Sequence, residues 1–172
     1  MADTKVDELY KNFQEVIKFL NENSQPSLST YADDTFRKVI VIAAASHFEE
    51  EIKDIILKFI EKESNKNIYL MSFVKNKAIE KKFHTYFSWE RSNCNNFFGL
   101  FGEEFKDMAS KKVDENSTLK EATKSFMEIG RTRNIILHQN FATISLESTA
   151  KEYYELYKKS FPFIEFLKEN LK

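Results

Sequence analysis

The chain contains very few of the residues that turns require, and this scarcity limits its fold more than any other feature of the sequence. Three glycines and two prolines occur in 172 residues, where average usage would give about 20. Sandwiches, barrels and propellers join short strands through turns rich in these residues, so such folds are disfavoured. Apolar residues recur at intervals of three and four along most of the chain, which is typical of amphipathic helices. We therefore expect one all-α domain over residues 1–172, an up-and-down bundle of four core helices with one or two short extra helices.

The apolar pattern also predicts where the helices begin and end. Pro26 and the hydroxyl side chains around it indicate a loop before the second helix, which should begin near Asp33. Ser117 or Thr118 should cap a later helix, and Pro162 should kink the last one. The expected helices cover residues 4–22, 33–63, a short part of 67–92 followed by an aromatic connector, 95–113 with a tight turn or close packing at Gly99 and Gly102, 119–139, and 148–171 with a capping box of Thr149 and Glu152.

The net charge and the cysteine content narrow the classes of function. The formal net charge is -1, so no global positive field draws the protein to nucleic acid or to an anionic membrane, and any RNA contact must come from a local cluster. Cys94 is the only cysteine, which excludes a disulfide scaffold and a cysteine-rich zinc site. The longest apolar run, residues 39–45, is far shorter than a helix that spans a bilayer. We expect a cytoplasmic protein with no membrane partner.

The expected helix over residues 119–139 breaks its own pattern at Arg133. On a helical wheel with about 100° per residue, Arg133 falls near the middle of the apolar stripe. A guanidinium is always charged, and at such a position it costs several kcal/mol unless it is paired or reaches a wet cavity. Two interpretations remain open: an ion pair with Glu49 or Glu50 of a neighbouring helix, or a binding site for an anion.

The residues around Arg133 favour the anion site. Asn134 and His138 are four apart and share one helix face, and Arg131 lies about 20° from His138 around the helix. Arginine presents a planar fork to phosphate oxygens, and the unperturbed pKa of histidine lies near neutrality. Such a set can bind a phosphodiester and move a proton. No second histidine or carboxylate stands at ligand spacing in this segment, so we expect neither a metal nor another cofactor.

The spacing of the two principal residues sets a geometric condition. Arg133 and His138 are five residues apart, about 140° around an ideal helix, so one straight helix cannot direct both side chains at one atom. They converge if the helix loosens near His138, if the arginine side chain wraps around the helix, or if a second copy of the helix completes the site. The third arrangement predicts a homodimer formed through these helices.

The string Arg133-Asn134-Ile135-Ile136-Leu137-His138 resembles the motif of the HEPN superfamily: an arginine, a polar residue, three variable residues and a histidine. We call residues 133–138 the motif. The stretches AAASHFEEEIKDII, FSWERSNCNNFFGLFGEEF and EIGRTRNIILHQNFATISLE are similar to the RiboL-PSP-HEPN branch, so the resemblance covers about residues 35–170. It implies a helical bundle that dimerises so that two motifs face one cleft. In many members it also implies a metal-independent endoribonuclease of toxin–antitoxin or antiphage-defence systems.

The resemblance implies a role for each polar residue of the motif. Arg133 would hold the scissile phosphate, His138 would transfer a proton, and Asn134 would orient one of them. The partner would be RNA, single-stranded or looped, and an antitoxin or defence-system protein would be a second partner. Members paired with a nucleotidyltransferase antitoxin usually carry a tyrosine two residues after the histidine, where this chain has Asn140. Other members only bind a nucleotide, RNA or a protein, which leaves a non-catalytic binding module as the alternative.

Two residues of the second expected helix are candidates to support the site. The resembling stretch of the family has a serine and a glutamate where this chain has Ser46 and Glu49. Glu49 would pair with Arg133 and fix its rotamer. His47, between them in sequence, is expected on a solvated helix surface.

The aromatic segment from residue 83 to 105 has two interpretations. Phenylalanines at three- and four-residue spacing usually face inward, so we expect most of the segment in the core. The alternative is base stacking by an exposed Tyr86 or Trp89, with phosphate contacts from three nearby cations, Lys81, Lys82 and Arg91.

Overall fold

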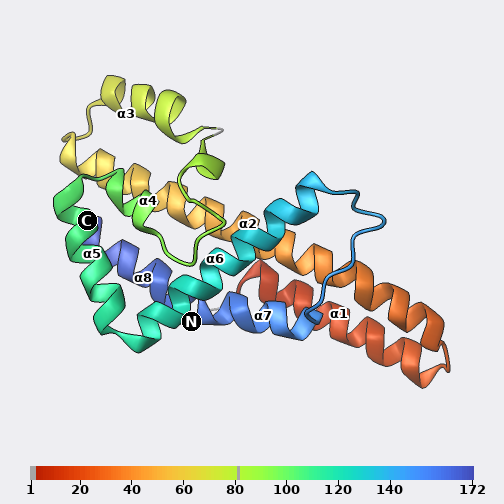
Figure 1. Ribbon diagram of the computed structural model, residues 1–172. Helices are drawn as coiled ribbons and strands as arrows, with labels where there is room; N and C mark the ends of the chain where they lie inside the picture. The colour runs from red at the N-terminus through yellow and green to blue at the C-terminus, as the bar shows by residue number, and fades with distance from the viewer. Residues whose placement is uncertain (1–2, 81) are drawn as a thin grey trace.

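The computed structural model describes residues 3–80 and 82–172, and in these residues the chain forms helices and turns without a β-strand. This confirms the prediction of an all-α bundle (Figure 1). The elements in chain order are α1 (Lys5–Glu22), α2 (Pro26–Glu63), α3 (Ile68–Val74), a π-helical turn η1 (Lys75–Ile79), a 3-10 turn η2 (Phe83–Thr85), α4 (Asn95–Gly99), α5 (Glu103–Glu115), α6 (Ser117–His138), α7 (Ala150–Lys159) and α8 (Phe161–Asn170).

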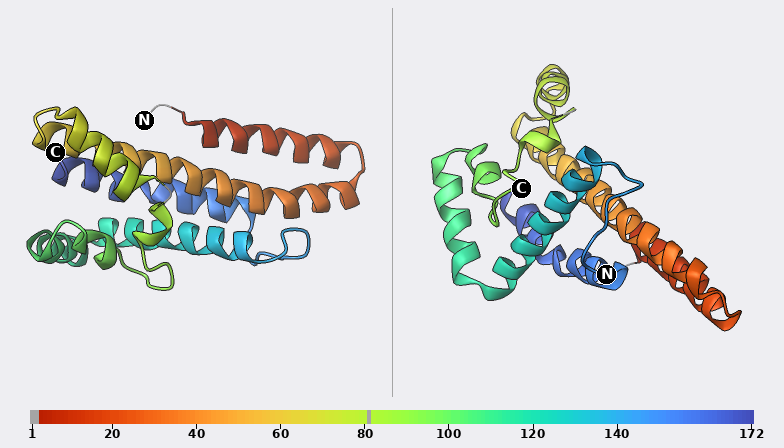
Figure 2. Two further views of the ribbon diagram at one scale, coloured as in Figure 1. Left: turned by 90° about the horizontal axis from the view of Figure 1, so that it is seen from above. Right: turned by 45° about the vertical axis from the view of Figure 1, so that its right-hand side comes forward.

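The long helix α2 is the spine of the bundle. α1 forms an antiparallel hairpin with it, and α6, α7 and α8 also pack against it (Figure 2). The centre of the core is aromatic: the ring centroid of Phe48 in α2 lies 5.6 Å from that of Phe126 in α6 and 5.2 Å from that of Tyr157 in α7. All three rings are buried, so the three helices are joined at one point.

Side-chain caps fix the first turns of two helices. Thr4 and Asp7 form a capping box at α1, and Thr149 and Glu152 form another at α7. In each box the threonine hydroxyl accepts a backbone N–H three residues on, and the carboxylate accepts the threonine N–H. The second box confirms the prediction for the start of the last helical region.

Two helix starts differ from the prediction for local reasons. α2 begins at Pro26 rather than near Asp33, because proline suits the first turn, where its missing N–H leaves no helical hydrogen bond unmade. Asn116, rather than Ser117 or Thr118, caps α6, and its side-chain oxygen accepts a backbone N–H three residues on at 3.0 Å. Asparagine is as good an N-cap as serine. Because Ser117 is already the first helical residue, Asn116 directly before it takes the N-cap position.

Two expected irregularities are complete breaks between helices. Pro162 does not kink one continuous helix: α7 ends at Lys159, and α8 begins at Phe161 with the proline in its first turn. The expected helix 95–113 is divided before Gly102, whose φ of 98° lies in the left-handed region that glycine adopts without strain. The prediction of a tight turn here is confirmed, but the helices on either side are separate.

A buried polar network joins the start of α1 to α7. Asp7 is 1% exposed and accepts hydrogen bonds from the Thr4 N–H at 2.7 Å, the Tyr154 hydroxyl at 2.7 Å and the Lys158 ammonium at 3.1 Å. Burial alone would raise the pKa of Asp7, but these hydrogen bonds favour the carboxylate and lower the pKa to about 2. The negative charge is therefore stable inside the protein.

The same network contains His47, which the sequence had placed on a solvated surface. Its Nδ1 lies 2.9 Å from the Tyr157 hydroxyl, which also lies 2.9 Å from the Thr4 hydroxyl. Its Nε2 lies 3.8 Å from a carboxylate oxygen of Glu51. The prediction of a solvated side chain is wrong, because α7 covers this face of α2 and supplies a hydroxyl partner.

None of the helices in the described parts of the chain combines the length and the apolar content needed to cross a bilayer.

Candidate active site

Helix α6 carries the motif at its C-terminal end. Buried side chains, among them Phe126, Ile129 and Ile136, hold the helix against the core. The helix ends at His138, and the Gln139 N–H closes the last turn on a carbonyl oxygen 3.1 Å away. The backbone at Gln139 is extended, so the chain leaves the helix directly after the histidine. The motif therefore lies at the end of a rigid helix.

A close contact one turn before Arg133 holds α6 against the aromatic connector. Trp89 lies so near Gly130 that a Cβ atom on this residue would stand 1.9 Å from the tryptophan ring. The indole N–H donates to the His84 carbonyl oxygen at 3.1 Å, which fixes the ring. This pair was not predicted from the sequence. A glycine inside a helix destabilises it, and such a glycine commonly marks close packing, so a signal was present.

Arg133 is half-buried at the edge of a narrow apolar recess. The recess has a volume of about 10 Å³, enough for roughly one water molecule. The aliphatic part of the arginine can cover this apolar surface while the guanidinium stays at the rim. The recess cannot hold a nucleotide, so an anion must approach Arg133 from outside. Its lining residues besides Arg133 are Ala45, Phe48, Phe83, Trp89, Phe126, Ile129 and Gly130.

Arg133 forms no ion pair with a carboxylate in the described part of the chain. Its Nη1 donates to the Asn134 side-chain oxygen at 3.0 Å, and most of its N–H groups remain available. The interpretation as an ion pair with Glu49 or Glu50 is therefore wrong. Glu49 pairs instead with Lys53, one turn further along α2, and Glu50 is exposed.

The proposed supporting residues form no side-chain hydrogen bond or ion pair with the motif. This is true of Ser46, Glu49 and Arg131 among residues 3–80 and 82–172. Ser46 and Arg131 are exposed. Glu49 lies near the connector, since burial and its negative charge together raise the pKa of Tyr86. A supporting role for these residues stays a prediction.

The structure brings the side chains of Arg133 and Asn134 together, but in the described residues neither side chain is hydrogen-bonded to that of His138. His138 is exposed, and no hydrogen bond links it to Arg133 within the described residues. α6 stays helical to its last residue, so the helix does not loosen near the histidine. The hydrogen bond to Asn134 directs the guanidinium toward the face that Asn134 shares with His138. The arginine side chain thus wraps part of the way around the helix.

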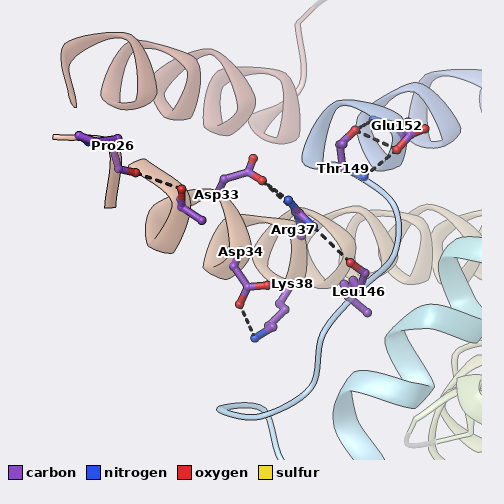
Figure 3. A network of polar contacts seen from close by, with 9 residues as sticks. Pro26, Asp33, Asp34, Arg37, Lys38, Leu146, Thr149 and Glu152 are labelled. Carbon is purple, nitrogen blue, oxygen red and sulfur yellow. Dashed lines mark hydrogen bonds and ion pairs between the residues drawn. The ribbon is translucent and has the colours of Figure 1, made fainter. Parts of the chain in front are cut away.

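Two cations of α2 hold the segment that follows the motif (Figure 3). Lys38 is 3% exposed, pairs with Asp34 at 3.0 Å and donates to the Phe141 carbonyl oxygen at 3.2 Å. Arg37 pairs with Asp33 and donates to the Leu146 carbonyl oxygen at 3.3 Å. Neither residue was predicted from the sequence as part of the site, although two adjacent cations just before an apolar run are visible there. They limit how far the chain beyond His138 can move.

Asn140 closes a turn in this segment. Its side-chain oxygen accepts the Ala142 N–H at 3.0 Å, and its carbonyl oxygen accepts the Ile144 N–H at 3.0 Å. Asparagine favours such turns because its side chain imitates the backbone. The residue that stands where the antitoxin-paired members usually have tyrosine therefore has a structural role in this chain.

The aromatic segment belongs to the core, as expected. Tyr86 and Trp89 are both buried, so neither offers an open face to a base. Lys82 and Arg91 are exposed, and Lys81 lies outside the described residues. The interpretation of Tyr86 or Trp89 as a base-stacking residue is wrong.

The comparison with known families decides which family this fold represents. A sequence model of the family RiboL-PSP-HEPN matches residues 7–172, which include all of the helices from α2 to α8. The chain belongs to the RiboL-PSP-HEPN family. The resemblance noted from the sequence is confirmed at the level of the family. No curated protein and no solved structure gives a significant match to the chain.

In this RiboL-PSP-HEPN protein the side chains near the motif do not resemble a metal centre. Over the described ranges, no group of three or more histidine, cysteine, aspartate or glutamate side chains is placed to hold a metal ion. The motif itself contributes one imidazole and one amide as potential ligands, which is fewer than a protein metal site uses. A reaction without a metal stays a prediction.

Proposed function

We propose that this RiboL-PSP-HEPN protein is an endoribonuclease that cleaves single-stranded or looped RNA without a metal ion. The observation that carries the proposal is the half-buried Arg133, which has no carboxylate partner in the described residues and is hydrogen-bonded only to Asn134. A guanidinium held in this way by packing can bind a phosphodiester. His138, at the end of the same helix, supplies an imidazole that can accept and donate a proton.

The chemistry requires a proton acceptor, a proton donor and a group that stabilises negative charge. The ribose 2′-oxygen attacks the neighbouring phosphorus while its proton passes to the acceptor. The bond from phosphorus to the 5′-oxygen of the next nucleotide breaks, and that oxygen receives a proton. The products are a 2′,3′-cyclic phosphate and a 5′-hydroxyl. His138 would transfer protons, and Arg133 would stabilise the charge on the phosphate oxygens. DNA lacks the 2′-hydroxyl and should survive.

We further propose that two copies of the chain form the complete site through their motif-bearing helices. In this arrangement Arg133 of one copy and His138 of the other would form each of two sites, and His138 would first accept the proton of the 2′-hydroxyl and then donate a proton to the leaving oxygen. Leu137 and Phe141, close to His138 in sequence, are 54% and 47% exposed. Apolar side chains beside a polar site fit an interface that excludes water. Since the recess at Arg133 is too small for a nucleotide, the facing copy would also help to enclose the RNA.

A binding module without catalysis is the second candidate. Two observations favour this candidate. In the described residues no hydrogen bond joins the side chains of Arg133 and His138, and Arg133 is half-buried whereas His138 is exposed to solvent. Such a site would hold a phosphate of RNA or a nucleotide through Arg133 alone. It predicts that ligand stabilises the protein against thermal unfolding without turnover of RNA. A role in a toxin–antitoxin or antiphage-defence system is part of either proposal and rests on the family resemblance.

The deciding experiment compares wild type with His138→Ala on end-labelled RNA in EDTA, with analysis of the product ends. We expect 2′,3′-cyclic phosphate ends from wild type and a rate about 10²- to 10⁴-fold lower from the variant, the usual contribution of a general acid or base. His84→Ala is the matched control, because His84 is also exposed and lies outside the motif. Equal cleavage by wild type and His138→Ala would remove the catalytic claim.

A mixing experiment tests whether the site is shared between copies. Arg133→Ala and His138→Ala protomers are each expected to be inactive alone. If the arginine of one copy works with the histidine of the other, equal mixing should restore about a quarter of wild-type activity, since half of the dimers would hold one intact site of two. No restoration, with mixed dimers shown to form, would contradict the shared site.

A further inference from the structure

Helix α3 exposes apolar side chains over most of its circumference. Val74 packs against the core, whereas four large apolar side chains face solvent: Ile68 is 70% exposed, Tyr69 84%, Leu70 46% and Phe73 63%. Figure 1 shows α3 standing apart from the other helices, beside the C-terminal part of α2. A helix that is apolar all round is normally buried. α3 therefore lacks the cover that its composition requires.

The lysines around α3 differ from those in the rest of the described chain. Lysines elsewhere mostly form ion pairs with nearby carboxylates, as Lys53, Lys58 and Lys151 do. No ion pair in the described ranges involves the five exposed lysines that flank α3, which are Lys62, Lys66, Lys75, Lys77 and Lys82. Three glutamates, Glu61, Glu63 and Glu80, offset part of this charge, and the sequence of residues 61–82 has six lysines against three glutamates, a net charge of +3.

Two grooves along the C-terminal part of α2 have an apolar floor and lysines at the rim. One groove, of about 400 Å³, is next to α3 and is floored by Ile56, Ile60, Val74, Ile79 and Phe101, with Lys77 and Lys82 at its rim. The other, of about 370 Å³, lies between α2 and the C-terminal end of α8 and is floored by Ile55, Phe59 and Leu171. Its rim holds Lys62 and Lys172, together with Lys58, which pairs with Asp54 of the same rim, and Lys168, which pairs with Glu51 and Glu165. Both grooves use the C-terminal part of α2, so one end of the molecule is both apolar and positively charged.

We propose that this end of the protein binds the surface of a bilayer that contains anionic phospholipids. We call the four exposed apolar residues of α3 and the five unpaired lysines the α3 surface. The apolar side chains enter the boundary between headgroups and acyl chains, and the lysines contact the negative headgroups. Charge complementarity carries the choice of an anionic surface, and the convex, protruding helix matches a flat one.

The aliphatic side chains distinguish a bilayer from RNA as the partner. Tyr69 and Phe73 could stack on bases, but Ile68 and Leu70 gain little from bases and are removed from water by lipid. The α3 surface also occupies another part of α2 than the motif. The recess at Arg133 uses Ala45 and Phe48, whereas the grooves use residues 55–60, about 10 residues or about 15 Å further along the helix.

The proposal departs from the expectation of no membrane partner, which came from the net charge. A net charge of -1 describes the whole chain. Attraction to a bilayer depends on charges within about one Debye length of its surface, which is roughly 8 Å in physiological salt. The net charge of +3 over residues 61–82 is a local excess that the balance over the whole chain conceals.

The test measures sedimentation of the full chain with vesicles of phosphatidylcholine alone and of phosphatidylcholine mixed with phosphatidylserine. We expect binding to the mixed vesicles only, weakened by added salt. Lys75→Glu with Lys77→Glu should lower the binding constant at least about tenfold, and Phe73→Ser should also lower it. Lys5→Glu with Lys151→Glu is the control of equal charge change. Phe19→Ser is the control for Phe73, because Phe19 is 64% exposed on α1.

Three outcomes would overturn the proposal. One is equal or absent binding to the two kinds of vesicle. Another is loss of binding in the control variants to the same extent as in the α3 variants. The third is unchanged vesicle binding by the α3 variants together with weaker binding of a labelled single-stranded RNA, which would assign the surface to nucleic acid. RNA cleavage in vesicle-free buffer should be the same for the α3 variants and wild type, so this test is independent of the proposed ribonuclease activity.

Discussion

Two histidines of this protein have opposite surroundings. His47 of α2 is half-buried, hydrogen-bonded to Tyr157 and close to Glu51, within a network that reaches Asp7. His138, the last residue of α6, is exposed and forms no hydrogen bond with a described side chain. The cations nearby differ in the same way, because Lys158 is bonded to buried Asp7, whereas Arg133 has only Asn134.

The difference separates polar groups that stabilise the fold from polar groups that are available to a ligand. Around Asp7 every described buried side-chain donor and acceptor has a partner inside the protein. Such a network stabilises the native state but has no capacity left for another molecule. At the motif the hydrogen-bonding capacity of the guanidinium is mostly unused. The same residue types therefore contribute to stability in one region and are proposed to serve RNA in the other.

The largest expected effect is that substitutions of the two histidines change different properties, RNA cleavage for His138 and stability for His47. His138→Ala should lower RNA cleavage by about 10²- to 10⁴-fold and leave the free energy of unfolding nearly unchanged. His47→Ala should lower the free energy of unfolding by about 1–3 kcal/mol, because the buried Tyr157 hydroxyl loses one of its two hydrogen-bond partners and the packing of the imidazole is lost, and it should keep cleavage per folded molecule. Urea unfolding and a cleavage assay on both variants give the answer. If His138→Ala and His47→Ala lowered the free energy of unfolding equally, the distinction between a stabilising and a ligand-binding histidine would be wrong.

The next largest effect concerns the contact that supports the motif. Gly130→Ala places a Cβ atom against the ring of Trp89, 1.9 Å from its nearest atom. Overpacking should outweigh the better helix propensity of alanine and lower the free energy of unfolding by about 2–3 kcal/mol. Gly99→Ala is the matched control, since its Cβ would meet the nearest atom at 3.7 Å. A Gly130→Ala protein as stable as wild type would show that Trp89 can move away at little cost.

Acid should remove part of the stability that comes from the Asp7 network. The pKa of Asp7 is lowered from 3.8 to about 2 in the folded protein, so its contribution is complete above pH 4 and disappears as the pH falls toward 2. The total is about 2 kcal/mol, of which about 1 kcal/mol should be lost by pH 3. Urea unfolding at several pH values measures it. Asp7→Asn should be less stable at pH 7 and should lack this dependence between pH 4 and 2.

The smallest expected effect is on the stability of the protein when Arg133 is replaced. Arg133→Ala should change the free energy of unfolding by less than about 1 kcal/mol, because no buried carboxylate loses its partner. A buried ion pair would have given a loss of about 3–5 kcal/mol. Thermal and urea unfolding of the variant decide between these values. A large loss would mean that Arg133 is part of the stabilising network after all.

The sequence predicted the parts of the fold that depend on local pattern. The helices at residues 5–22 and 117–138 follow from the spacing of apolar residues, and the capping box at Thr149 follows from residue type and spacing. The start at Pro26 was missed because proline is compatible with both a loop and a first helical turn. For the site, the sequence identified Arg133 as an anomaly on an apolar stripe, and the string around it indicated the family.

Only the tertiary structure decided which polar groups are partnered. Glu49 pairs along its own helix with Lys53, Trp89 approaches Gly130, and Lys38 holds the segment after the motif. These contacts join residues that are far apart in the chain or compete on one helix face, and their choice depends on how helices pack. Periodicity and caps act within a few residues, so a single sequence shows them directly. The partner of a charge is set by distances in space between helices, which a one-dimensional pattern does not contain.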